Sequence, residues 1–96
     1  MEEIRIQSIR FDADQKLLDF VKKKLSKLPK FHDSVIGIDV KLSLAEHDNK
    51  NVWVKVQVPG NDVVVERNAA TFEDAVVDCA DVLKEKLKRI KEKQVK

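Results

Sequence analysis

The sequence Val-Ile-Gly-Ile-Asp-Val-Lys-Leu-Ser-Leu at residues 35–44 alternates apolar and polar side chains along its whole length. This period-two alternation is typical of a β-strand with one buried and one wet face. The apolar face carries Ile36, Ile38, Val40, Leu42 and Leu44. A second alternation at 52–58 follows the polar loop 46–51, and a third strand at 63–67 follows a Pro-Gly-Asn-Asp turn. The pattern therefore predicts an antiparallel meander of three strands.

Two amphipathic helices flank this meander. Asp14 can cap a helix over residues 15–28, and Pro29 is placed to end it. Its apolar face consists of Leu17, Val21, Leu25 and Leu28. A second helix is expected to follow Thr71 and run to about residue 92, with Asp74 completing a motif that resembles a capping box. Its apolar stripe consists of Phe72, Val76, Cys79, Leu83, Leu87 and Ile90.

A further alternation at residues 3–9 adds a first strand and completes the order β-α-β-β-β-α. If the first two strands share an edge, the helix between them makes them parallel neighbours and lies on one face of the sheet. The last helix must bury its stripe on the same face, because only one face of the strands is continuously apolar. We therefore expect an α+β fold, a two-layer α/β sandwich in which two helices cover one face of a four-stranded mixed sheet.

Length and composition narrow the class of protein. The 96 residues allow a single domain, expected over 1–96, and the one cysteine excludes an internal disulfide framework. No apolar run approaches the roughly 18 residues of a membrane span, and the N-terminus lacks the pattern of a signal peptide. These features predict a cytoplasmic protein without a membrane partner.

The positive charge is concentrated in the two helices, although the formal net charge is only +2. Residues 15–30 hold six lysines against one acid, and residues 84–96 hold seven Lys or Arg against two acids. Helical geometry gathers the first group into a stripe of Lys16, Lys23, Lys27 and Lys30. In the last helix Lys84, Lys88 and Lys91 form one ridge, while Lys86, Arg89 and Lys93 form another. Two such helices side by side predict one basic plateau and a polyanion site.

The polyanion is expected to be a nucleic-acid backbone. The two glycines are too far apart for a phosphate-binding Gly-rich loop. Lysines outnumber arginines in the stripes, which suits backbone neutralisation better than base reading and predicts no DNA specificity. Helices that present spread charge without an aromatic platform favour recognition of structured RNA by shape.

The sequence resembles the ribosome hibernation-promoting factors, also called ribosome-associated inhibitors or sigma-modulation proteins. The resemblance rests on Asp-Phe-Val-Lys-Lys-Lys-Leu-Ser-Lys-Leu at 19–28, where the family pattern is D-Y-V-x-K-K-L-x-K-L. It also rests on Val-Pro-Gly at 58–60, Glu-Asp-Ala-Val-Val-Asp at 73–78 and the basic ending at 83–91. Together these elements span almost the whole chain.

The resemblance implies a fold related to double-stranded RNA-binding domains, and a partner in the small ribosomal subunit and its ribosomal RNA. It implies that two basic helices occupy the mRNA and tRNA channel and silence ribosomes in stress or stationary phase by occlusion, without chemistry. The matching positions are Lys23, Lys24, Lys27, Lys30, Lys88, Arg89 and Lys91. The chain departs from the pattern at Glu85, Phe20 and Phe72. It resembles the short form without a dimerisation domain, which leaves open whether it pairs ribosomes or only inactivates single ones.

The remaining signals predict no cofactor, no metal site and no enzymatic activity. His32 and His47 lack neighbours at ligand spacing, and Cys79 lies on an apolar stripe where an inert buried thiol is expected. Trp53 and Val64 fall on the wet face of the sheet. Trp53 either packs over lysine stems, forms a self-association surface or stacks on RNA. An alternative function is therefore a small interaction module that forms a weak homodimer through its open sheet face.

Overall fold

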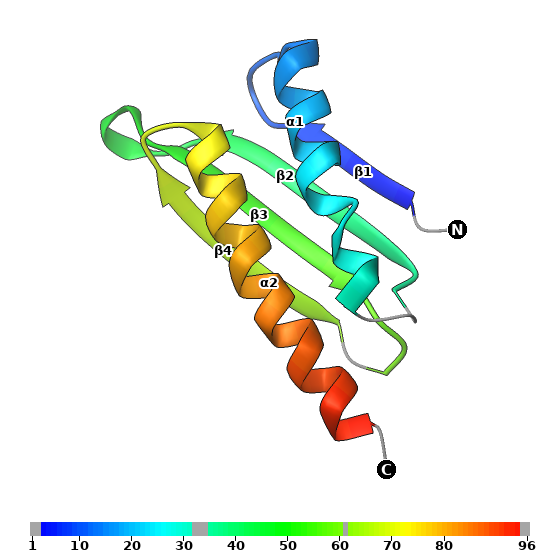
Figure 1. Cartoon of the computed structure of the whole chain (residues 1–96). Helices are drawn as coiled ribbons and strands as arrows, with labels where there is room; N and C mark the ends of the chain where they lie inside the picture. Colours follow the sequence, from blue (N-terminus) through cyan, green and yellow to red (C-terminus); the bar gives the residue numbers. More distant parts are fainter. Residues whose placement is uncertain (1–2, 32–34, 61, 95–96) are drawn as a thin grey trace.

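The computed structural model describes residues 3–31, 35–60 and 62–94 of the chain. The elements follow the predicted order (Figure 1). They are the strand β1 (Glu3–Ser8), the helix α1 (Gln15–Leu25), the 3-10 turn η1 (Leu28–Phe31), the strand β2 (Gly37–Leu44), the 3-10 turn η2 (Glu46–Asp48), the strands β3 (Lys50–Gln57) and β4 (Val63–Ala69), and the helix α2 (Phe72–Gln94). The predicted α+β fold class is confirmed.

The four strands form one mixed sheet in the order β1-β2-β3-β4. β1 pairs in parallel with β2, with Ile4 opposite Ile38, as a crossover through α1 requires. β2, β3 and β4 pair antiparallel and form the expected meander. In that register Val40 faces Val54, which in turn faces Val65, so the apolar positions of neighbouring strands share one face.

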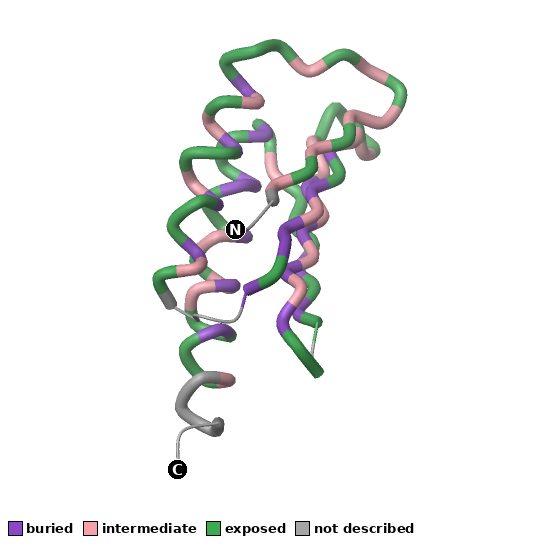
Figure 2. The backbone as a smooth tube through the Cα atoms, turned by 90° about the vertical axis from the view of Figure 1, so that its right-hand side faces the viewer, coloured by how far each residue is buried: buried purple, intermediate pink, exposed green. Residues whose placement is uncertain are grey.

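The core lies between this apolar face and the helices. Both helices lie on the same face of the sheet, and in the side view the buried residues follow the space between the two layers (Figure 2). From the helices the fully buried side chains include Val21, Leu25, Leu83 and Leu87; from the strands they include Ile38, Leu42, Val52, Val54 and Val56. The opposite face of the sheet is left without a covering layer in the described part of the chain.

Two sequence-based expectations fail at the ends of elements. α1 ends at Leu25 rather than near residue 28, and the chain rewinds as the 3-10 turn that contains Pro29. The proline has no N–H and disfavours a helical residue before it, but the tighter turn still buries Leu28. Ile36, just before β2, is 57% exposed, and Leu44, at the end of β2, is 56% exposed. The alternation of apolar and polar residues continues to both positions, but the buried core does not extend that far.

The two hairpin turns have the expected polar composition and a left-handed backbone. In the loop between β2 and β3, His47 and Asp48 both have positive φ, within the 3-10 turn. In the turn between β3 and β4, Gly60 has a φ of 78°, a conformation that glycine adopts at no steric cost.

Candidate nucleic-acid interface

α1 is held at its N-terminus by the predicted cap. The Asp14 Oδ1 atom accepts a hydrogen bond of 2.8 Å from the Leu17 N–H, one of the amides that the helix itself leaves unpaired. With Leu17, Val21 and Leu25 buried, Lys16 and Lys23 stand exposed on the far side of the helix. The cap and the core thus orient the lysine stripe of α1 away from the sheet.

Lys24 differs from its neighbours because it is half-buried. Its Nζ atom lies 5.5 Å from the centroid of the Phe20 ring, a cation–π geometry. Phe20 in turn packs against the core, so the ring that contacts the Lys24 ammonium is itself held in place by the core. A phenylalanine provides this support without the hydroxyl of the tyrosine in the family pattern.

α2 begins as predicted, with the Thr71 Oγ1 atom accepting a hydrogen bond of 3.1 Å from the Asp74 N–H. Its buried stripe includes Cys79, whose thiol donates to the Val52 carbonyl oxygen at 3.7 Å. Burial raises the pKa of the Cys79 thiol from 9.0 to about 11, so it remains protonated at neutral pH. The expected buried cysteine is confirmed, and it packs between α2 and β3.

The two helices meet at a hollow of about 200 Å³ that gathers charged side chains from both. Lys24, Lys27 and Leu28 line it from the α1 side, and Ala80, Asp81 and Lys84 line it from α2. We call this region the interhelical groove. Lys24 and Lys27 thereby share one space with Lys84, which lies 60 residues after Lys24 in the sequence.

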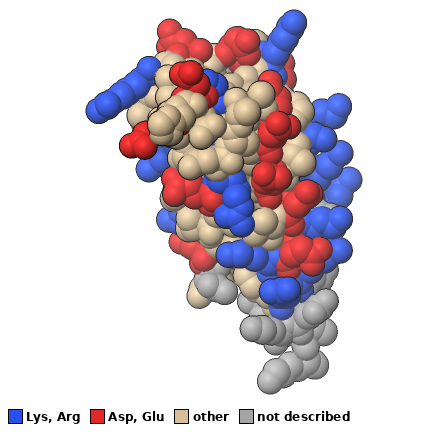
Figure 3. Space-filling model, turned by 90° about the vertical axis from the view of Figure 1, so that its left-hand side faces the viewer, with Lys and Arg blue, Asp and Glu red and all other residues tan. Residues whose placement is uncertain are grey.

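The lysines of α2 divide between two sides of the helix. At about 100° per residue, Lys84 and Lys88 lie on the side of α2 that faces α1, which we call the α1 flank. Lys86 and Arg89 lie on the other side, which we call the β4 flank, and both line a separate hollow against β4. Between the flanks runs an acidic stripe of four exposed side chains, Asp74, Asp78, Asp81 and Glu85. Figure 3 shows acidic side chains in a column beside a column of basic ones on this part of the surface.

The structure therefore distributes the predicted site residues unevenly. Around the interhelical groove it gathers Lys24, Lys27 and Lys84. Lys16, Lys23 and Lys30 are exposed on α1 and η1 without lining the groove, and Lys88 is exposed one turn beyond Lys84. Arg89 belongs to the β4 flank, and the Lys91 side chain lies outside the described residues. Instead of one continuous plateau, α2 presents two basic flanks with acid between them.

Asp81 also lines the groove, although the sequence pattern did not predict it there. Its carboxylate shares the hollow with the three lysines and lowers the positive potential there. The signal was present, because Asp81 and Lys84 stand three residues apart on one helix and are therefore neighbours.

On the open face of the sheet, Trp53 is half-buried and the Lys41 Nζ atom lies 4.8 Å from the centroid of its ring. Lys41 is the cross-strand partner of Trp53, so the packing of a lysine over the indole follows from the register. Val64 is 45% exposed but pairs with Lys55, so it is only a diagonal neighbour of Trp53. The two side chains are therefore diagonal rather than directly opposite neighbours on the open face.

The described residues offer neither a metal-binding cluster nor a membrane-spanning helix. No three His, Cys, Asp or Glu side chains of the described ranges cluster in a way that could hold a metal ion. Within those same ranges, neither helix is both long and apolar enough to cross a membrane.

The fold and the groove together define a class of protein: a small α+β domain whose helical layer presents a basic groove between two helices. Residues 4–95 match the family model described as sigma 54 modulation protein / S30EA ribosomal protein, and the chain belongs to this family. The family is non-enzymatic.

Known relatives agree with this placement. The chain is 28% identical over 92 residues to a protein of Pseudomonas putida named ribosome hibernation promoting factor, covering 96% of this chain and 89% of the relative. It is similar to the crystal structure of the N-terminal domain of Thermus thermophilus Protein Y, with a TM-score of 0.78, 28% identity and coverage of 93% of this chain and 94% of the other. A ribosomal subunit interface protein from Coxiella burnetii has the same fold, with a TM-score of 0.86 at 19% identity and coverage of 94% and 98%.

Proposed function

We propose that this chain is a ribosome hibernation factor: a single domain that binds the small ribosomal subunit in the mRNA and tRNA channel and silences translation under stress or in stationary phase. The observation that carries the proposal is the interhelical groove, where Lys24 of α1, Lys27 of the turn after α1 and Lys84 of α2 converge. Membership of the family supports the ribosome as the partner. A ribosome-bound role also implies a cytoplasmic protein.

The groove suits ribosomal RNA because its cations are spread along two helices. Lysines neutralise phosphates as point charges and release counterions, which provides affinity without reading bases. Lys16, Lys23 and Lys30 extend this charge along α1 and η1. The inhibition would be steric, because a bound domain occupies space that mRNA and tRNA need, and no residue has to perform chemistry.

Reversing two charges in the groove tests the proposal. Lys27→Glu with Lys84→Glu should weaken binding to small ribosomal subunits at least tenfold and abolish inhibition of in-vitro translation. Each lost phosphate contact should also lower the log–log salt slope by roughly 0.7–0.9. Binding is measured by co-sedimentation through a sucrose gradient at several salt concentrations, and inhibition by the yield of a reporter protein.

A matched control makes the same change in charge elsewhere. Lys22→Glu with Lys41→Glu alters one exposed lysine on the opposite side of α1 and one on the open sheet face. We expect this control to bind within about threefold of the parent chain. Equal loss in both variants would mean that net charge, rather than the groove, governs binding. If the parent chain does not sediment with ribosomes at low salt, the proposed function is wrong.

A further inference from the structure

The strand β4 lies at the edge of the sheet. It pairs with β3 on one side, and within the described part of the chain no strand pairs with its other side. Toward the end of β4, the Arg67 guanidinium donates to the Glu66 carbonyl at 2.9 Å, so a side chain already covers that part of the backbone. The beginning of β4, at Val63–Val65, has no such cover among the described residues. An uncovered edge can accept another extended chain through its main-chain N–H and C=O groups.

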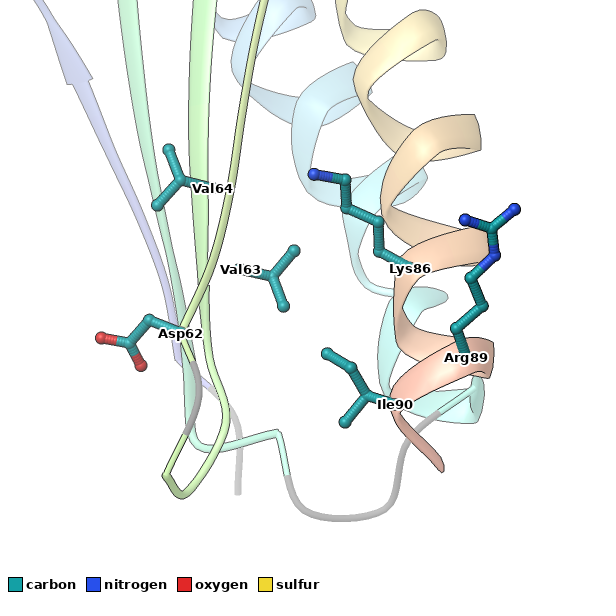
Figure 4. Close-up of a pocket in the computed structure, with 6 residues that line it drawn as sticks. All are labelled: Asp62, Val63, Val64, Lys86, Arg89 and Ile90. Atoms are coloured by element: carbon teal, nitrogen blue, oxygen red, sulfur yellow. The ribbon is translucent and has the colours of Figure 1, made fainter. Parts of the chain in front are cut away.

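A hollow of about 330 Å³ lies beside this uncovered edge, between the beginning of β4 and the last turns of α2. Val63 and Ile90 point toward each other across it from the two layers (Figure 4). Lys86 extends from α2 toward the strands, while Asp62 and Val64 point away from the helix (Figure 4). The hollow thus has an apolar floor over which Lys86 extends, whereas the Arg89 side chain points up along α2, away from the strands (Figure 4).

Two cations and one acid line this hollow. Lys86 and Arg89 are exposed, and neither forms an ion pair with another described side chain. The nearest lining acid, Asp62, instead pairs with Lys55 at 3.4 Å on the open face of the sheet. The hollow therefore presents two cations next to a strand edge, separated from the interhelical groove by the acidic stripe of α2.

We propose that the edge of β4 and the β4 flank of α2 together bind an extended acidic peptide segment of a protein partner, which adds to the sheet as a fifth strand. In an added strand, alternate side chains point to opposite faces. Acidic side chains on the helix side would meet Lys86 and Arg89, and apolar side chains on the open side would cover Val64. Main-chain hydrogen bonds would provide the affinity and the two cations the preference for acid.

A second copy of this chain fits the site less well. An antiparallel β4 from another copy would bring the end of its strand next to the beginning of this one. The side chain on its helix side would then be Arg67, which follows Val63 and Val65 in the alternation. Arg67 would face Lys86 and Arg89 with like charge, so the electrostatics oppose self-association through this edge and favour an acidic partner.

The test uses a defined probe: a capped heptapeptide of alternating valine and glutamate, titrated into the isotopically labelled full chain while backbone amide resonances are followed. We expect saturable shifts at Val63–Val65 and around Lys86. Lys86→Glu with Arg89→Glu should weaken binding at least tenfold. A heptapeptide with lysine in place of glutamate should also bind at least tenfold more weakly.

Two N-methylated versions of the probe examine strand addition itself. One carries methyl groups on all valine nitrogens and the other on all glutamate nitrogens, so each blocks one edge of the peptide. Only one version should lose binding, because only one edge can face β4. Equal effects of the two versions would overturn strand addition.

The groove variant Lys27→Glu with Lys84→Glu provides the control, and it should bind the peptide within about twofold of the parent chain. If it loses the peptide to the same extent as the Lys86 and Arg89 variant, the binding reflects overall charge and the proposal fails. The proposal also fails if a single-stranded RNA oligonucleotide shifts the same amides and displaces the peptide. Because the readout involves no ribosome, its failure is distinct from that of the proposed function.

Discussion

The two flanks of α2 carry similar charge but have different surroundings. On the α1 flank, Lys84 shares a hollow with Lys24 and Lys27 of the other helical segment. On the β4 flank, Lys86 and Arg89 stand beside the edge of a strand and two apolar side chains. The first arrangement adds the fields of cations from two elements, which suits a polyanion. The second offers two cations and backbone hydrogen-bonding groups, which suits an extended peptide.

The neighbouring element, more than the number of lysines on a helix, decides what a basic helix can bind. The acidic stripe reinforces the difference because it lies between the flanks along the exposed side of α2. A polyanion that bound Lys84 and Arg89 at once would have to cross this stripe at Glu85. We therefore expect the two flanks to act independently.

The largest effect should come from removing the common support of both flanks. Leu83 is fully buried on the underside of α2, so Leu83→Ala should destabilise the fold by about 2–5 kcal/mol through lost burial and the cavity left behind. Ribosome binding and peptide binding should then decline together as the folded fraction falls. Thermal unfolding followed by circular dichroism measures the loss of stability.

The reactivity of the Cys79 thiol shows whether α2 remains packed on the sheet in each variant. Its buried thiol, with a pKa raised to about 11, should react slowly with a thiol reagent at pH 8 in the parent chain. Leu83→Ala should accelerate the reaction, whereas the charge variants on either flank should leave it unchanged. Binding that survives in Leu83→Ala under conditions where Cys79 reacts rapidly would contradict the dependence of the flanks on the seated helix.

An intermediate effect should follow from weakening the barrier between the flanks. Asp78→Asn with Asp81→Asn removes two negative charges, one of them inside the interhelical groove. We expect affinity for non-specific RNA to rise about two- to fivefold at low salt, an effect that salt should screen. Ribosome binding should rise less, so selectivity falls.

Filter binding to an unstructured RNA, compared with ribosome co-sedimentation, measures this change in selectivity. Glu46→Gln with Asp48→Asn is the matched control, because it removes two acids from the exposed loop between β2 and β3. An equal increase in the control would show that the acidic stripe has no particular role.

Most of the fold could be predicted from the sequence because local patterns and the register agree. Alternation at 35–44 marked β2, and the stripe from Phe72 to Leu87 marked α2, since burial on one face enforces each period. The ends were less predictable. α1 stops at Leu25 and Leu28 is buried from a 3-10 turn that contains Pro29, and periodicity does not distinguish these two geometries because both bury Leu28.

The candidate site could be predicted only as far as single helices determine it. The helical wheel correctly separates the Lys84 side of α2 from the Lys86 side. It does not say which side faces α1, because that depends on how the helix lies on the sheet. The positions of Asp81 in the groove and of Arg89 beside β4 depend on how α2 packs against α1 and the sheet, so they could not be predicted from the helix alone.

The smallest effect should come from the open face of the sheet, away from both flanks. Trp53→Ala removes the ring that lies under Lys41, at a cost of about 1 kcal/mol in stability if the half-buried indole contributes packing and a cation–π contact. Ribosome binding and peptide binding should both change by less than twofold, because neither the groove nor the β4 hollow includes Trp53. Sedimentation equilibrium of the parent chain and the variant provides the decisive comparison. The same molar mass for both would exclude a homodimer that depends on Trp53, whereas a parent dimer that becomes a monomer in Trp53→Ala would instead establish the open face as a self-association surface.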